Sequence, residues 1–125
     1  IGPSDPTWIA RNADAFARAG TKVALCDAIP VTEVTSMLRA AGIALITHDD
    51  RFESYRLALP NKLFHAVHAG VPVVASDAPA MAQVVQRYGL GQTYRIGDAA
   101  DLRRAVAAVI ADYEQYRANV ADAAE

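Results

Sequence analysis

The sequence has few of the residues that mark several common classes of protein. Cys26 is its only cysteine, which excludes an internal disulfide and a cysteine-based metal cluster and favours a reducing compartment. No apolar run approaches the roughly 20 residues that a membrane-spanning helix needs, and no charged segment followed by an apolar one opens the chain. We therefore expect a cytoplasmic protein in which Cys26 is a small buried core residue.

The chain also lacks an excess of positive charge. Its formal net charge is −2 at pH 7, so it has no basic field of the kind that nucleic-acid-binding proteins use, and we expect no nucleic-acid partner. Any anionic ligand must then be bound by a few well-placed groups. The glycine-rich G-x-G-x-x-G and P-loop patterns are absent, and no grouping of serine, histidine and acid stands out as a nucleophilic site.

Two places in the sequence have residues that metals use as ligands. His65 and His68 lie three residues apart on a predicted helix, but no third ligand is evident. His48, Asp49 and Asp50 end a predicted strand, and adjacent acids in a polar loop are more often solvated than bound to a cation. We therefore predict no metal site.

Length and composition favour one domain over residues 1–125. The chain is 53% hydrophobic and 21% charged, a balance that allows a chain of this size to bury its own core. The sequence begins at Ile1 without a methionine. We expect it to be a fragment of a longer protein.

Helical patterns and short apolar runs alternate along the sequence. Prolines and capping residues mark helix starts, glycines mark helix ends, and apolar runs without alternation indicate strands covered on both faces. The expected elements are a helix between Asp5 and Gly20, a strand over 23–26, a helix capped by Thr32 and ended by Gly42, a strand over 43–47, a polar loop over 48–59, a helix between Pro60 and Gly70, a strand over 71–75, a helix from Pro79 to before Gly89, a strand over 92–96, and a helix capped by Asp98 with a break near Asp112.

The most informative stretch covers residues 56–77 and has the sequence RLALPNKLFHAVHAGVPVVASD. Pro60 and Gly70 bracket its helix, because proline is tolerated at a helix start and glycine is favoured just past a helix end. The first turn of that helix has unpaired N–H groups beside the cation of Lys62, which together suit an anion such as phosphate. Asn61 is equally well explained as a simple N-cap.

The alternation of strands and helices predicts an α/β fold, a Rossmann-like three-layer parallel sheet flanked by helices with right-handed crossovers. In such sheets ligands bind outside the carboxyl ends of the strands. The expected carboxyl ends are residues 27–29, 48–55 and 76–79.

The central stretch resembles a known family, the carboxyl-terminal, donor-binding domain of two-domain retaining glycosyltransferases of the GT-B type, also called glycosyltransferase group 1. The family segment has a form similar to PNKLFEYMAAGxPVVASD. Residues 1–3 resemble the glycine-ended second strand of that domain, and the stretch AIPVTEVTSMLRAAGIALI resembles the part that leads into its fourth strand. The resemblance implies that the first strands of the domain precede Ile1. The residues that match the segment are Pro60, Asn61, Lys62, Leu63, Phe64, Ala69, Gly70, Pro72, Val73, Val74, Ala75, Ser76 and Asp77.

The resemblance also implies a set of donor-binding residues. It places Ala28 and Ile29 near the nucleotide base, the loop over 53–59 near the diphosphate and His65 near the ribose. Family members often have two glutamates about eight residues apart, and this sequence has Leu57 and His65 at those positions. The implied donor-binding residues are Asn61, Lys62, His65, Ser54, Tyr55 and Ile29, and the catalytic residues stay unknown.

The expected function is the transfer of a sugar, of the hexosyltransferase type, from a nucleotide-diphosphate sugar to an acceptor that the sequence does not identify. The nucleotide sugar is the donor substrate, and no further cofactor is expected. Two alternatives stay open: a nucleotide-sugar epimerase of related fold, and a non-catalytic nucleotide-binding or interaction domain, which the two missing glutamates favour.

The expected partners follow from the same resemblance. An N-terminal acceptor-binding domain is expected in the full-length protein, whose peripheral association with membranes stays open, and the isolated fragment is expected to be inactive. Because a central strand is expected before Ile1, the chain alone should have an incompletely paired sheet edge or a second copy that covers it as a homodimer.

Overall fold

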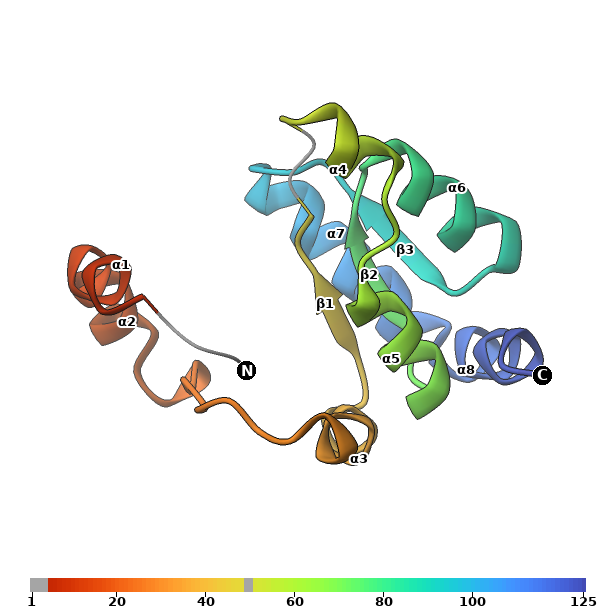
Figure 1. Cartoon of the computed structure of the whole chain (residues 1–125), viewed down its shortest axis with the longest axis horizontal. Coiled ribbons are helices and arrows are strands. Elements are labelled where there is room, and N and C mark those ends of the chain that lie inside the picture. Colours follow the sequence, from red (N-terminus) through yellow and green to blue (C-terminus); the bar gives the residue numbers. More distant parts are fainter. Residues whose placement is uncertain (1–4, 49–50) are drawn as a thin grey trace. The chain divides into compact units, whose positions relative to one another are not determined.

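The structure is a computed structural model that describes residues 5–48 and 51–125 (Figure 1). Its contacts divide the chain into two compact units, Ile1–Glu33 and Val34–Glu125. The boundary falls within helix α3 (Val31–Ala41).

The first unit contains short helices instead of the single predicted helix. Helix α1 (Pro6–Arg11) is capped by Asp5, whose carboxylate accepts a hydrogen bond from the Thr7 N–H, as expected for an N-cap. Helix α2 (Ala13–Ala19) follows directly and leads into the 3-10 helix η1 (Gly20–Lys22). The break is at Asn12, whose side-chain amide donates to the Trp8 carbonyl at 2.8 Å and competes with the regular backbone ladder.

The prediction of a strand over residues 23–26 is wrong. This segment has no regular secondary structure, and Val23 and Leu25 are 49% and 53% exposed. No strand in the described part of the chain pairs with it, so its backbone groups cannot form a ladder. Cys26 is exposed as well, and the prediction that it is a buried core residue is also wrong.

The second unit is built on a three-stranded parallel sheet. Its strands are β1 (Ala44–Ile46), β2 (Val73–Ser76) and β3 (Gly91–Tyr94), in the order β1-β2-β3. Leu45 lies opposite Val74 in the register of β1 and β2. The α/β fold class predicted from the sequence is therefore confirmed.

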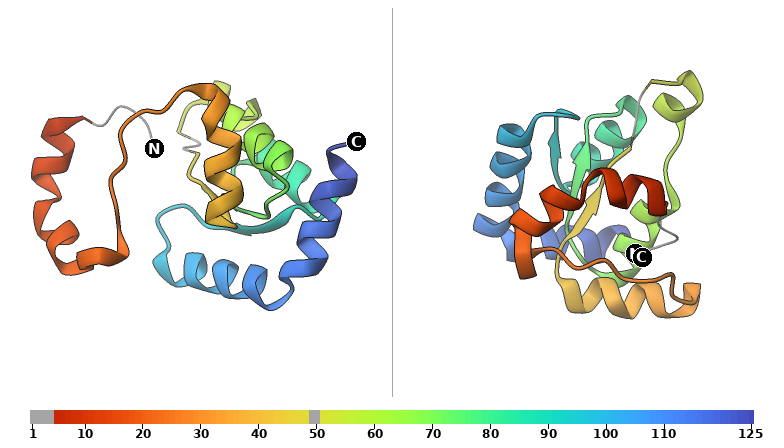
Figure 2. Two further views of the ribbon diagram at one scale, coloured as in Figure 1. Left: turned by 90° about the horizontal axis from the view of Figure 1, so that it is seen from below. Right: turned by 90° about the vertical axis from the view of Figure 1, so that its left-hand side faces the viewer.

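Helices connect and cover the strands (Figure 2). Helix α4 (Glu53–Leu57) lies inside the segment over 48–59 predicted as a loop and packs against α6 (Pro79–Tyr88). The helices of the second unit after α3 are α4 (Glu53–Leu57), α5 (Asn61–Ala69), α6 (Pro79–Tyr88), α7 (Ala99–Ala111) and α8 (Tyr113–Ala123).

The sheet is the middle of three layers (Figure 1). Helices α5, α6 and α8 contribute to the core on one face, and α7 packs on the other face. On the second face the buried core consists of Val74, Tyr94, Ala105 and Val109. On the first face it includes Ala44, Ile46, Val73 and Ala75 from the strands and Leu63, Ala66, Met81, Val85 and Val120 from the helices.

Most predicted helix ends in this unit are confirmed. Gly70 and Gly89 end α5 and α6 in the left-handed conformation, with φ of 69° and 59°. The Asp98 carboxylate accepts hydrogen bonds from two N–H groups at the start of α7. Thr32 was predicted as the cap of α3, but that helix begins at Val31, and the Glu33 N–H bonds the Pro30 carbonyl instead.

Strand β1 lies at one edge of the sheet, and no described strand pairs with its outer side. Leu45 is 52% exposed, although Val74 beside it is fully buried. The further strand or second copy expected at this edge stays a prediction. Separately, none of the helices in the described residues is both long enough and apolar enough to cross a membrane.

Candidate functional site

A buried hydroxyl joins the carboxyl ends of β1 and β2. Ser76, the last residue of β2, is fully buried. Its Oγ accepts a hydrogen bond from the His48 N–H and donates one to the His48 carbonyl, both at 2.8 Å. A serine hydroxyl has one donor and two lone pairs, so one side chain satisfies both backbone groups. The segment that leaves β1 is therefore held at the end of β2.

Asp77 makes the corresponding link toward β3. Its carboxylate accepts a hydrogen bond from the Ile96 N–H at 3.3 Å. Burial raises the pKa of the nearby Tyr94 hydroxyl, and the negative charge of Asp77 adds to that effect. A cavity of about 300 Å³ lies at this edge, lined by Thr47, Tyr94 and the segment that leads into α7. The three strand ends thus form one polar edge with a hollow beside it.

The first turn of α5 has no capping side chain. The helix follows Pro60, and Asn61 is its first residue, so the explanation of Asn61 as an N-cap is wrong. The Leu63 N–H donates to the Pro60 carbonyl at 2.9 Å. The N–H groups of Asn61 and Lys62 have no hydrogen-bond partner among the described residues, and both side chains are exposed. Two amide donors and one cation therefore face solvent at this end of α5.

Other predicted site residues lie on α5 and α4. His65 is half-buried, and it lies four residues after Asn61 and three after Lys62, a spacing that puts all three on neighbouring positions of one helix surface. Ser54 and Tyr55 are in the first turn of α4, where Ser54 is exposed and no side chain caps the helix. Leu57, at one of the two family glutamate positions, is 73% exposed.

The remaining predicted site residue, Ile29, is half-buried and belongs to the first unit. Within residues 5–48 and 51–125, no group of three or more histidine, cysteine, aspartate or glutamate side chains could hold a metal ion. Asp49 and Asp50 lie outside the described residues.

Ser76 and Asp77 are the residues whose role the sequence did not predict. The sequence places both in the matching segment and at an expected carboxyl strand end, over 76–79, but gives neither a partner. A polar pair at the end of an apolar run was the available signal, but the partners, His48 and Ile96, lie 28 and 19 residues away in the sequence. Such long-range pairs become visible only when the strand ends are brought together.

A parallel sheet between two layers of helices defines a Rossmann-like class of α/β domain. A comparison with protein families is more specific. The sequence model of the family described as Glycosyl transferases group 1 matches residues 1–112. The chain therefore belongs to the group 1 glycosyl transferases, and the resemblance drawn from its residues is confirmed.

Family membership identifies the general reaction as glycosyl transfer. Comparison with curated proteins gave no match, and neither did comparison with solved structures. The assignment of the whole chain to one donor-binding domain and the roles of the predicted site residues stay predictions.

Proposed function

We propose that this chain is the donor-binding domain of a two-domain retaining glycosyltransferase that uses a nucleotide-diphosphate sugar. The diphosphate binds at the first turn of α5, and the ribose lies beside the next turn. The sugar is transferred to an acceptor held by an N-terminal domain of the full-length protein. The proposed donor-binding residues are Asn61, Lys62, His65, Ser54, Tyr55 and Ile29.

One observation carries this proposal: Lys62 lies in the first, uncapped turn of a helix. The positive end of a helix dipole disfavours a cation there, and Lys62 forms no ion pair with any described residue that would offset this cost. A bound anion removes the conflict, because it interacts favourably with both the lysine and the free amides.

The same groups suit the chemistry of sugar transfer. When the bond between the sugar and the diphosphate breaks, the leaving diphosphate takes the electron pair and gains negative charge. The Lys62 ammonium and the N–H groups of Asn61 and Lys62 are positioned to stabilise that charge. The domain then contributes by binding and electrostatic stabilisation, with no covalent intermediate on these residues.

A non-catalytic nucleotide-binding domain is the second candidate. Leu57, where family members often have a glutamate, is an exposed apolar side chain that cannot bind hydroxyl groups. The transferase and the non-catalytic domain differ in whether they break down a nucleotide sugar. Release of nucleoside diphosphate from a nucleotide sugar by the full-length protein supports the transferase, whereas binding without release supports the second candidate.

The first test of the proposed site is Lys62→Ala in the full-length protein. We expect the affinity for nucleoside diphosphates to fall by about 1.5–3 kcal/mol, the usual range for a hydrogen bond to a charged group. Titration calorimetry with UDP, GDP and ADP measures this change, and the urea midpoint should barely move because the side chain is exposed.

The matched control is Lys22→Ala, since Lys22 is the chain's only other lysine and is also exposed. Its affinity for each nucleotide should equal that of the wild type. Equal losses in the two variants would indicate a general charge effect, and no loss in either would remove Lys62 from the donor site.

The second test is His65→Glu. A neutral imidazole offers one hydrogen bond per nitrogen, whereas a carboxylate accepts from both ribose hydroxyls at once. We expect the substitution to raise nucleotide affinity roughly tenfold at pH 8, the effect of one added charge-assisted hydrogen bond. Gln86→Glu, which adds the same charge at an exposed position on α6, serves as the control. Unchanged affinity in His65→Glu would show that this position does not face the ribose.

A further inference from the structure

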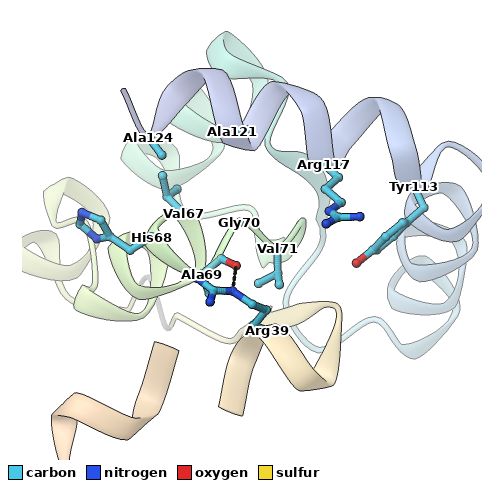
Figure 3. A pocket seen from close by; sticks show the side chains of 10 residues that line it. All are labelled: Arg39, Val67, His68, Ala69, Gly70, Val71, Tyr113, Arg117, Ala121 and Ala124. Carbon is cyan, nitrogen blue, oxygen red and sulfur yellow. Dashed lines mark hydrogen bonds between the residues drawn. The ribbon is translucent and has the colours of Figure 1, made fainter. Parts of the chain in front are cut away.

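A cavity of about 550 Å³ lies among α3, α5 and α8 (Figure 3). This volume is typical of small-molecule sites. Arg39 of α3, the end of α5 and Arg117 of α8 form its walls. Val71 in its wall leads into β2, and α3 precedes β1, so the cavity lies near the amino ends of the strands. The candidate donor site is at the opposite, carboxyl ends.

The charged lining of this cavity is positive. Arg39 and Arg117 supply this charge, and none of the described lining residues is acidic. The Arg117 guanidinium points toward the interior in Figure 3. Its ion pair with Glu114 is long, at 4.0 Å, and the Glu114 side chain is 84% exposed, so this pair neutralises little of the charge.

Two neighbouring contacts hold the walls in place. Arg39 Nε donates to the Ala69 carbonyl at 3.3 Å, which offsets the negative end of the α5 dipole where it meets the cavity. The Tyr113 hydroxyl donates to the Gly42 carbonyl at 2.9 Å and ties the start of α8 to the end of α3. The terminal amino groups of Arg39 make no hydrogen bond within the described part of the chain.

The family match does not account for this cavity. It ends at residue 112, whereas α8, which supplies Tyr113 and Arg117, begins at residue 113. The cavity therefore combines walls from α3 and α5, which the match covers, with a wall from α8, which lies beyond it. Its two guanidinium groups come from separate helices and are both exposed, so an anion can reach them from solvent.

We propose that this cavity is a second ligand site, for a small organic phosphomonoester. Guanidinium groups bind phosphate oxygens through paired hydrogen bonds, which fits the positions of Arg39 and Arg117. Val67, Val71 and Ala121 supply an apolar wall, which fits an organic group better than a free phosphate ion. Binding there links α8 to α3 and α5 and stabilises the second unit.

Titration calorimetry on the full-length protein tests this site with phenyl phosphate, inorganic phosphate and benzyl alcohol. We expect phenyl phosphate to bind more tightly than inorganic phosphate and benzyl alcohol not to bind. Equal affinity for the two phosphates would overturn the organic part of the proposal. The absence of phenyl phosphate binding at roughly ten millimolar would overturn the site, since the proposed contacts should give at least millimolar affinity.

Variants separate this site from the donor site. Arg117→Gln should weaken phenyl phosphate binding about tenfold or more, the loss of one charge-assisted contact. Arg103→Gln, an exposed arginine on α7, is the matched control and should have no effect. Lys62→Ala should leave phenyl phosphate binding unchanged. Loss of binding in Lys62→Ala but not in Arg117→Gln would place the phosphate in the donor site and overturn the proposal.

Amide chemical shifts in the wild-type protein locate the ligand without any variant. Gly70 lines the cavity, whereas Gly97 lies at the carboxyl ends of the strands. Phenyl phosphate should shift the Gly70 amide resonance and leave Gly97 in place. A shift of Gly97 with no change at Gly70 would contradict the proposed location.

Discussion

Ser76→Ala tests whether one hydroxyl organises the carboxyl edge of the sheet. The substitution removes both hydrogen bonds to the His48 backbone, each 2.8 Å long. A net contribution of about 1 kcal/mol per hydrogen bond gives about 2 kcal/mol for the pair. His48 is half-buried, so water can replace part of this contribution. We expect a loss of about 1.5 kcal/mol in the free energy of unfolding.

Urea unfolding followed by far-ultraviolet circular dichroism measures this loss. The midpoint should fall while the slope stays constant, because Ser76→Ala changes stability and not the area exposed on unfolding. Ser36→Ala is the control, since Ser36 is an exposed serine on α3. If the two variants differed by less than about 0.5 kcal/mol, the range of ordinary surface substitutions, Ser76 would not hold the strand ends together.

Two further predictions concern the packing and the pH dependence of the second unit. Gly91→Ala should cost about 3 kcal/mol or more, because a Cβ there would lie 1.9 Å from the Val73 carbonyl oxygen. Gly97→Ala, which has a positive φ of 81° but open space around it, should cost only about 1 kcal/mol, and equal urea midpoints for the two would refute the clash. The pKa of the Tyr94 hydroxyl is higher in the folded state than its usual value of 10.0. The stability that this hydroxyl contributes is therefore complete below pH 10.0, and it is lost as pH rises through the folded pKa. Between pH 8 and 11, wild type should therefore lose more stability in urea than Tyr94→Phe does, and parallel losses would contradict this assignment.

Local signals explain which parts of the fold were predictable. Pro60, Gly70, Gly89 and Asp98 act within one turn of their own position, through a restricted φ, a left-handed conformation or a side-chain cap. The apolar runs that form β1 and β2 need burial on both faces, so they indicated strands without knowledge of their partners. The α/β class followed from the alternation of these elements.

Tertiary contacts decided the rest. The segment over 23–26 has the composition of a strand, but a strand also needs a neighbour to receive its backbone hydrogen bonds, and no described strand provides one. Helix α4 is too short to be stable alone and packs against α6, so its presence in a polar stretch depends on that contact.

The candidate site also has one part that the sequence determined and another part that only the tertiary structure decided. The sequence alone determined that Asn61, Lys62 and His65 share the start of one helix, because their spacing and the preceding proline are local properties. Only the tertiary structure decided that Ser76 binds the backbone of His48, and that Arg39 and Arg117 line one cavity. The two residues of each pair are far apart in the sequence, so no local sequence pattern could predict the contact between them.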